Sequence, residues 1–222
     1  KVAFPVEVHA ARATYEIAFG VIERPTHRNT SWDQARFEVS GHRWADLSET
    51  GYGVAVLNDS KYGWDIEGNV IRLTLLRSPE DPGPNADLGE HRFTYSLLPH
   101  AGVWLGDVLA EAHALNAPLT AVCEPAHEGD LPSPRALAVV RGAPSVVLDT
   151  VKRAEDNDEI VLRVYEALGG RMPVTIEMHR PIASAVECNL LEEEVAPAEH
   201  EFNRLTFRIQ PFEVRTFRVR LG

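Results

Sequence analysis

Residues Val214–Leu221 read VRTFRVRL, and from Phe217 to Leu221 arginines alternate strictly with apolar side chains. A period of two residues is typical of a β-strand with one wet face and one buried face. Residues 204–209 (RLTFRI), 70–75 (VIRLTL) and 90–97 (EHRFTYSL) show the same period, and residues 53–57 (GVAVL) give a shorter apolar example. The sequence therefore predicts a fold made of many short strands.

Turn residues separate these segments. Residues 58–63 (NDSKYG) form a polar loop between two apolar strands, and residues 67–69 (EGN) indicate a tight turn. Residues 154–158 (AEDND) separate two further strand-like segments and predict a hairpin. Residues 79–89 hold three prolines and two glycines, which favours an irregular loop. Short strands with turns between them are typical of β-sandwiches.

One stretch departs from the β pattern. Residues 106–116 (GDVLAEAHALN) are rich in alanine and leucine, with apolar residues at helical spacing. Asp107 could cap the start and Pro118 closes the end, so we expect a single short helix at residues 107–116. Residues 124–134 are rich in proline, glycine and acids and indicate a linker. We therefore expect domains at residues 1–123 and 135–222.

Composition narrows the function. The net charge of −11 argues against nucleic-acid binding, and no apolar run approaches the ~20 residues of a membrane-spanning helix. The chain starts without methionine or a signal pattern, so we expect a piece of a longer protein. Cys123 and Cys188 lack metal-ligand spacing and lie in apolar stretches. They predict buried, reduced thiols and a cytoplasmic protein.

Motifs that carry chemistry are scarce. Neither HExxH nor GxSxG occurs, so a zinc-protease site or a hydrolase triad has no support in the sequence. Asp59 and Asp65 flank residues 61–63 (KYG), and two carboxylates could hydrolyse a glycoside if they lay on either side of a sugar ring. Such residues more often satisfy the backbone groups of their own loop.

Aromatic and basic residues gather in one region of the chain. Such a set fits a carbohydrate-facing surface, a domain interface or an ordinary core. Its members are Trp32, Arg36, Phe37, His42, Arg43, Trp44, Tyr52, Tyr62 and Trp64.

The first half of the chain also carries a resemblance to a known family. The segments concerned are residues 24–33 (RPTHRNTSWD), 37–49 (FEVSGHRWADLSE), 51–63 (GYGVAVLNDSKYG) and 73–79 (LTLLRSP). In their order along the chain and in their residues, these segments resemble the C-terminal region of glycoside hydrolase family 38 α-mannosidases, particularly the bacterial and cytosolic branch. The resemblance is strongest over residues 23–118, and the final ninety residues resemble the terminal β-sandwich of these enzymes more loosely.

The resemblance implies an all-β fold, with a mutarotase-like supersandwich segment followed by a smaller immunoglobulin-like β-sandwich. It implies a retaining exo-α-mannosidase whose zinc, nucleophile and acid/base carboxylate belong to an N-terminal catalytic domain. No catalytic or zinc-binding residue is carried over to this chain, so we expect it to hold no cofactor and to be inactive alone. The expected partners are that catalytic domain and, through the full enzyme, mannose-containing glycans. Neither nucleic acid nor membrane is expected, and homo-oligomerisation is left open.

Three hypotheses follow. The chain is a non-catalytic module that packs on the catalytic domain and helps to form the sugar cleft, an autonomous carbohydrate-binding β-sandwich, or an enzyme using carboxylates near Asp59. For the first hypothesis, Asn58, Asp59, Lys61 and Tyr62 are the candidates for the cleft or the interdomain surface, because binding groups are commonly held on loops between rigid strands. The alternative is a turn in which Asn58 and Asp59 bond only to their own backbone.

Overall fold

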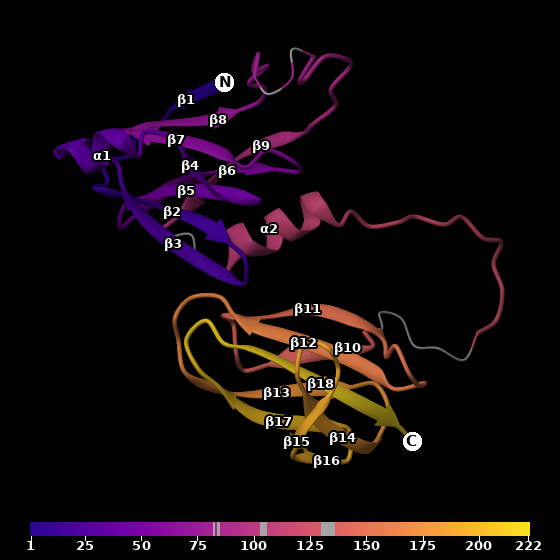
Figure 1. Cartoon of the computed structure of the whole chain (residues 1–222). Coiled ribbons are helices and arrows are strands. Elements are labelled where there is room, and N and C mark those ends of the chain that lie inside the picture. The colour runs from indigo at the N-terminus through magenta and orange to yellow at the C-terminus, as the bar shows by residue number, and fades with distance from the viewer. Residues whose placement is uncertain (82, 84, 103–105, 130–135) are drawn as a thin grey trace. The chain divides into compact units, whose positions relative to one another are not determined.

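The computed structural model describes residues 1–81, 83, 85–102, 106–129 and 136–222 (Figure 1). By its internal contacts the chain divides into two compact units, unit 1 at Lys1–Ala121 and unit 2 at Val122–Gly222. Each unit holds two antiparallel sheets, and the fold is all-β, as the sequence predicts.

Unit 1 is a sandwich of two sheets. The first has the strand order β1-β8-β7-β4 and the second the order β3-β2-β5-β6-β9. The bounds are β1 Val2–Pro5, β2 Arg12–Ile17, β3 Gly20–Pro25, β4 Val39–Ser40, β5 Trp44–Ser48, β6 Tyr52–Asn58, β7 Gly63–Glu67, β8 Val70–Thr74 and β9 Tyr95–Ala101. The turn at residues 67–69 joins β7 to β8, and the loop at residues 58–63 joins β6 to β7.

Alternation along the strands of unit 1 separates two buried layers. Ala45 and Leu47 of β5 point into the core between the sheets, together with Trp64 of β7 and Ile71 and Leu73 of β8. Because successive strand residues face opposite sides, Trp44 and Asp46 lie on the other face of β5. Both are buried as well, so this sheet is covered on its two faces over β5.

The structure holds two helices in its described residues, where the sequence predicts one. α2 spans Asp107–Asn116, as expected, but Gly106 is the N-cap residue and Asp107 is the first helical residue, so the expected cap is wrong. Val108, Leu109 and Ala112 are the buried residues of α2, and the Asn116 amide donates to the Asn58 carbonyl at the end of β6. The second helix, α1, spans Ser31–Ala35 and has no buried residue. Its sequence therefore has no apolar periodicity from which a helix could be predicted.

Unit 2 is a second, separate sandwich. One sheet has the order β10-β13-β17-β16, and the other has the order β11-β12-β18-β14-β15. The bounds are β10 Ala138–Arg141, β11 Val146–Arg153, β12 Ile160–Glu166, β13 Met172–Met178, β14 Ile182–Cys188, β15 Glu194–Pro197, β16 His200–Glu201, β17 Arg204–Ile209 and β18 Val214–Leu221. The predicted hairpin is confirmed, since β11 and β12 pair antiparallel around residues 154–159.

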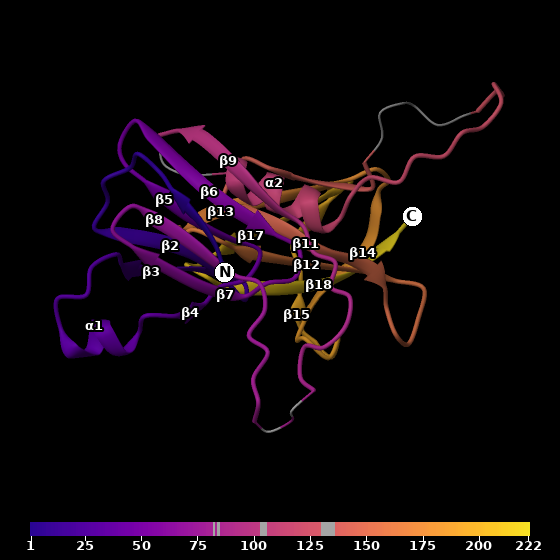
Figure 2. The same cartoon turned by 90° about the horizontal axis from the view of Figure 1, so that it is seen from above.

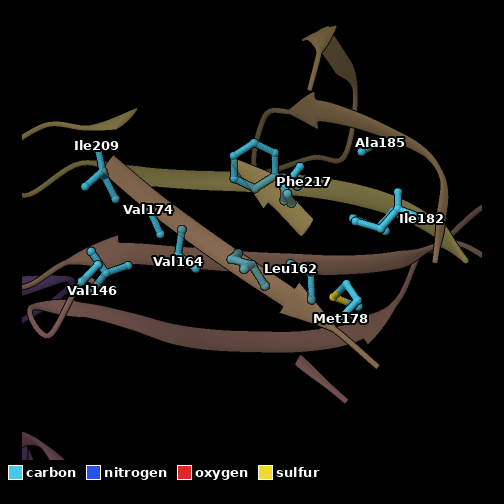
Figure 3. Packing of buried hydrophobic residues seen from close by; sticks show 13 residues of the cluster. Val146, Leu162, Val164, Val174, Met178, Ile182, Ala185, Ile209 and Phe217 are labelled. Atoms are coloured by element: carbon cyan, nitrogen blue, oxygen red, sulfur yellow. The ribbon is translucent and has the colours of Figure 1, made fainter. Parts of the chain in front are cut away.

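The core of unit 2 explains the pattern of β18. Phe217 and Val219 are buried between the two sheets, where Leu162 and Met178 also point (Figure 3). The arginine face is occupied by ion pairs: Arg218 Nε lies 3.2 Å from the Glu159 carboxylate. Arg218 and Arg220 thus pair with Glu159 on the face opposite Phe217, whereas Arg215 lies on the same face as Phe217, with its guanidinium 5.3 Å from that ring.

The predicted linker at residues 124–134 stays a prediction. Residues 117–129 contain neither helix nor strand, and residues 130–134 lie outside the described part of the chain. Within the described residues, no helix is long and apolar enough to span a membrane.

Candidate functional site

The buried side chain of Asn58 holds the backbone of the predicted site loop, residues 58–63, by hydrogen bonds. Its side chain is fully buried, its Oδ1 accepts from the backbone N–H groups of Ser60 (3.0 Å) and Lys61 (2.5 Å), and its Nδ2 donates to the His42 carbonyl (3.0 Å). These are the bonds of an Asx-turn, which holds the loop at a fixed angle to β6. The Asn58 side chain therefore shapes the loop.

Asp59 ties the same loop to the segment before β9. Its Oδ2 accepts from the Thr94 N–H at 2.8 Å, its own N–H donates to the Thr94 carbonyl at 3.2 Å, and the Ser60 hydroxyl donates to Oδ1. Burial raises the pKa of Asp59, but the bonds from Thr94 and Ser60 outweigh it, so the pKa lies below its usual range. Asp59 is held as a carboxylate by its neighbours.

Lys61 is partly exposed and Tyr62 is exposed, and each side chain lies against another ring. The Lys61 ammonium lies 4.7 Å from the centroid of the Phe93 ring, and the Tyr62 ring packs at 5.6 Å from His42. Tyr62 is 54% exposed. Lys61 offers a cation and Tyr62 offers an aromatic ring with a hydroxyl group, and both could contact a sugar or another domain. That the two residues face the cleft or the interdomain surface stays a prediction.

Asp65, the second carboxylate considered for hydrolysis, is engaged by three cations. Arg28 Nη2 lies 2.9 Å from Oδ1, and Lys1 Nζ and Arg72 Nη1 each lie 3.4 Å from the carboxylate. Asp65 is buried in β7. Its carboxylate is thus occupied by ion pairs within unit 1, and removing it would leave these cations without their partner.

The aromatic and basic cluster separates into a buried set and an exposed set. Trp44 and Trp64 are fully buried, so for them the core interpretation applies. Trp32 is 78% exposed and Phe37 is 54% exposed, and both belong to the α1 segment (residues 27–39). Figure 2 shows α1 standing away from the strands of unit 1.

A cavity of about 330 Å³ lies beside the α1 segment. Four arginines and two carboxylates line it, so its wall is basic in a chain with a net charge of −11. The lining residues are Arg12, Tyr15, Ile22, Glu23, Arg24, Pro25, His27, Arg28, Asp33, Arg36, Phe37, Val39 and Ile66. The segment RPTHRNTSWD that carries the family resemblance supplies part of this wall, although no motif marked it as a cavity.

Two polar pairs are buried beyond the predicted site. The Glu16 carboxylate accepts from Arg43 Nε at 3.0 Å, and the Arg43 guanidinium lies 3.2 Å from the His113 ring of α2. The Asp46 carboxylate lies 2.7 Å from His100 Nε2. Burial raises the pKa of Asp46, although bonds from Ser48 and His100 oppose this. Through His113, the first pair connects the sheet that contains β2 and β5 to α2, whereas the second pair joins β5 to β9 within that same sheet.

Within the described residues, no group of three or more His, Cys, Asp or Glu side chains could hold a metal ion. Neither cysteine forms a disulfide, but the expectation that both are buried is wrong for Cys123. Cys123 is exposed because the stretch after α2 makes no strand to bury it. Cys188 is buried in β14, and burial raises the pKa of its thiol.

The fold defines a region of two antiparallel β-sandwich units. Two family models match it: the glycosyl hydrolases family 38 C-terminal domain over residues 1–85, and the family 38 C-terminal beta sandwich domain over residues 145–217. The chain belongs to the C-terminal region of the family 38 glycoside hydrolases, and the three relatives compared below are α-mannosidases.

Three relatives show the extent of the likeness. Alpha-mannosidase 2C1 of Homo sapiens is 46% identical over 96% of this chain, Alpha-mannosidase G of Dictyostelium discoideum is 44% identical over 95%, and Alpha-mannosidase of Saccharomyces cerevisiae is 37% identical over 99%. The chain spans 21%, 20% and 22% of these three proteins, respectively. The relatives are thus about five times longer than the region described.

A solved structure shares the fold. The crystal structure of an alpha-mannosidase from Enterococcus faecalis matches 98% of this chain and 25% of its own, with a TM-score of 0.76 and 23% sequence identity.

Proposed function

We propose that this chain is the non-catalytic C-terminal β module of a retaining, zinc-dependent exo-α-mannosidase. It packs on the catalytic domain of the same polypeptide and helps to form the sugar cleft in glycan degradation. The observation that carries this proposal is that both units match C-terminal domain models of family 38, while the chain spans only about a fifth of its α-mannosidase relatives.

The proposal assigns the zinc site to the catalytic domain. A zinc ion needs three or four nitrogen, sulfur or carboxylate ligands, and no cluster of that kind occurs among the described residues. The residues present here therefore do not fit the metal. Their part is to support the domain that binds it, and Lys61 and Tyr62 are the side chains that we assign to the cleft or its rim.

An activity assay tests the catalytic part of this proposal. The 222-residue chain should not hydrolyse aryl α-mannosides, with or without added zinc, whereas the full-length polypeptide should. The outcome that would overturn it is activity of the purified chain that disappears on Asp59→Asn or Asp65→Asn. That result would make the chain an enzyme in its own right.

An autonomous carbohydrate-binding module is the second candidate. The exposed rings of Trp32, Phe37 and Tyr62 favour it, because sugars stack on aromatic faces. Titration of the isolated chain with mannose separates the two functions, since only an autonomous module needs affinity without the catalytic domain. The two free cysteines are compatible with the cytoplasmic location that we include in the proposal.

A further inference from the structure

The α1 segment is ordered by local contacts but covers nothing. Thr30 and Asp33 form a capping box: the Asp33 N–H donates to the Thr30 hydroxyl oxygen at 3.1 Å, and the Thr30 N–H donates to the Asp33 carboxylate at 3.1 Å. Bonding from Thr30 keeps the pKa of Asp33 below its usual range. Yet α1 has no buried residue. A five-residue helix gains little from its own hydrogen bonds, so tertiary packing is the expected source of its stability.

Both ends of this segment are fixed to the sandwich. Arg28 pairs with Asp65 on β7 at 2.9 Å, and Val39 pairs with Trp64 in the ladder between β4 and β7. The segment is therefore presented on a rigid frame, and Trp32 and Phe37 are held outward from it. Large aromatic side chains are enriched at the centres of protein interfaces.

Arg24 adds a charge that the described residues do not neutralise. Its guanidinium lies over the Tyr15 ring at 4.7 Å, and its Nη1 is buried with no hydrogen-bond partner. The neighbouring cations of the cavity are paired: Arg12 with Glu23 at 2.8 Å, and Arg28 with Asp65. Within the described part of the chain, Arg24 has no carboxylate within ion-pair distance. Burial lowers the pKa of Arg24, because a desolvated cation without a partner is unfavourable.

We propose that the α1 segment and the Arg24 cavity form the docking surface for the catalytic portion of the same polypeptide, which inserts a carboxylate side chain beside Arg24. The proposal rests on the proposed function, because it names the surface through which the module packs. The cavity of about 330 Å³ has room for an acidic side chain. A guanidinium binds a carboxylate in a bidentate geometry, and this pair would complete the coordination of Arg24.

Two observations favour this occupant. The chain spans 21% of the human relative, so the relatives carry a large additional portion that could cover α1. A basic cavity in a chain with a net charge of −11 is also a local exception, and electrostatic complementarity then selects an acidic partner. Trp32 and Phe37 would supply the apolar contact around that ion pair.

Hydrogen exchange gives the direct test. Backbone amides at residues 29–37 should exchange about tenfold or more slowly in the full-length polypeptide than in the 222-residue chain, because docking closes the local opening of an exposed segment. If protection appears only elsewhere in unit 1, for example at residues 58–63, the module packs on the catalytic portion but this docking surface is wrong. If no residue of either unit gains protection, the proposed function fails as well.

A pair of substitutions tests the role of the charge. Arg24→Met keeps the apolar stem on Tyr15 and removes the guanidinium. In the 222-residue chain it should leave the unfolding midpoint unchanged or raise it, whereas in the full-length polypeptide it should lower the midpoint of the transition that includes unit 1. Trp32→Ala should likewise act only in the full-length polypeptide. Equal effects of these substitutions in both proteins would overturn the proposal.

Arg92→Met is the matched control. Arg92 is 88% exposed and pairs with Glu90 outside the cavity, so its replacement should be neutral in both proteins. Sodium acetate serves as the probe for a small anion. If acetate raises the midpoint of the isolated chain through Arg24, and residues 29–37 gain no protection in the full-length polypeptide, the cavity takes a solute and docking is refuted.

Discussion

Glu166 is the residue whose replacement should most damage unit 2. Its side chain is fully buried at the end of β12, and its carboxylate accepts from the N–H groups of Leu168 (3.1 Å), Gly169 (2.7 Å) and Phe212 (3.1 Å). One carboxylate thus fastens two turns, the turn between β12 and β13 and the turn between β17 and β18. The perturbation is Glu166→Ala, which removes the shared acceptor.

The magnitude follows from the orphaned donors. A buried N–H that loses its acceptor costs about 1–3 kcal/mol. Gly169 and Phe212 are exposed, so water can reach part of the turn, and the lower end applies to each donor. Three donors then give about 3 kcal/mol of lost stability for unit 2. For a domain of this size, that loss lowers the unfolding midpoint by about 12–24 °C.

Thermal and urea unfolding of the 222-residue chain, followed by circular dichroism, measure this change. The control is Glu177→Ala, because Glu177 is partly exposed on β13 and its pair with Arg141 spans 3.5 Å at the surface. That substitution should change stability by no more than about 0.5 kcal/mol. A Glu166→Ala effect as small as the control would refute the account of the two fastened turns.

The pH dependence gives an independent check on Glu166. Burial raises its pKa, but the N–H groups of Phe212 and of the turn outweigh burial, so the folded-state pKa lies below its ordinary value. A carboxyl group with a lowered folded-state pKa contributes stability above its unfolded pKa of about 4.3 and loses it as the pH falls through the folded-state pKa. The difference between wild type and Glu166→Gln should therefore shrink below about pH 4. A difference that stays constant down to acid unfolding would contradict it.

Three further predictions concern unit 1. Lys61→Ala or Tyr62→Phe should lower kcat/KM or the unfolding midpoint of the full-length polypeptide, and if both leave both quantities unchanged, the loop belongs to neither cleft nor interface. Asn58→Ala should destabilise unit 1 by about 2–4 kcal/mol in urea unfolding, because buried backbone groups lose their partners; a neutral result would show that the Asx-turn is dispensable. Gly53→Ala should cost about 1–3 kcal/mol, since a Cβ there would overlap the His100 ring; an unchanged midpoint would mean that the ring can move aside.

The strands were predictable because their signal is local. The alternation at Val214–Leu221 and the polar turn at residues 58–63 are each contained in a few consecutive residues, and the structure places β18 and the loop after β6 there. α2 was predictable for the same reason, since most of its residues, DVLAEAHALN, favour a helix. Local patterns therefore gave the architecture.

The burial of individual side chains was harder to predict from the sequence. Trp32 and Trp44 stand in the same aromatic cluster of the sequence, yet one is exposed and the other fully buried. Their difference depends on which face of β5 is covered and on α1 leaving the sandwich, and both are long-range properties. The expected burial of Cys123 failed similarly, because an apolar stretch is buried only where a neighbouring strand pairs with it.

Acidic residues did not mark a functional site in this chain, and the reason is physical. A buried carboxylate is retained only where cations or N–H groups satisfy it. Asp65 meets three cations, Glu16 meets Arg43, and Glu166 meets the N–H groups of two turns, so each is accounted for by the fold that contains it. In such a chain, the more informative group is a partly buried cation without its counter-charge. Arg24 is such a group, and it lies in the cavity beside α1, the helix that carries the exposed Trp32, so a carboxylate from a docking partner would complete its coordination.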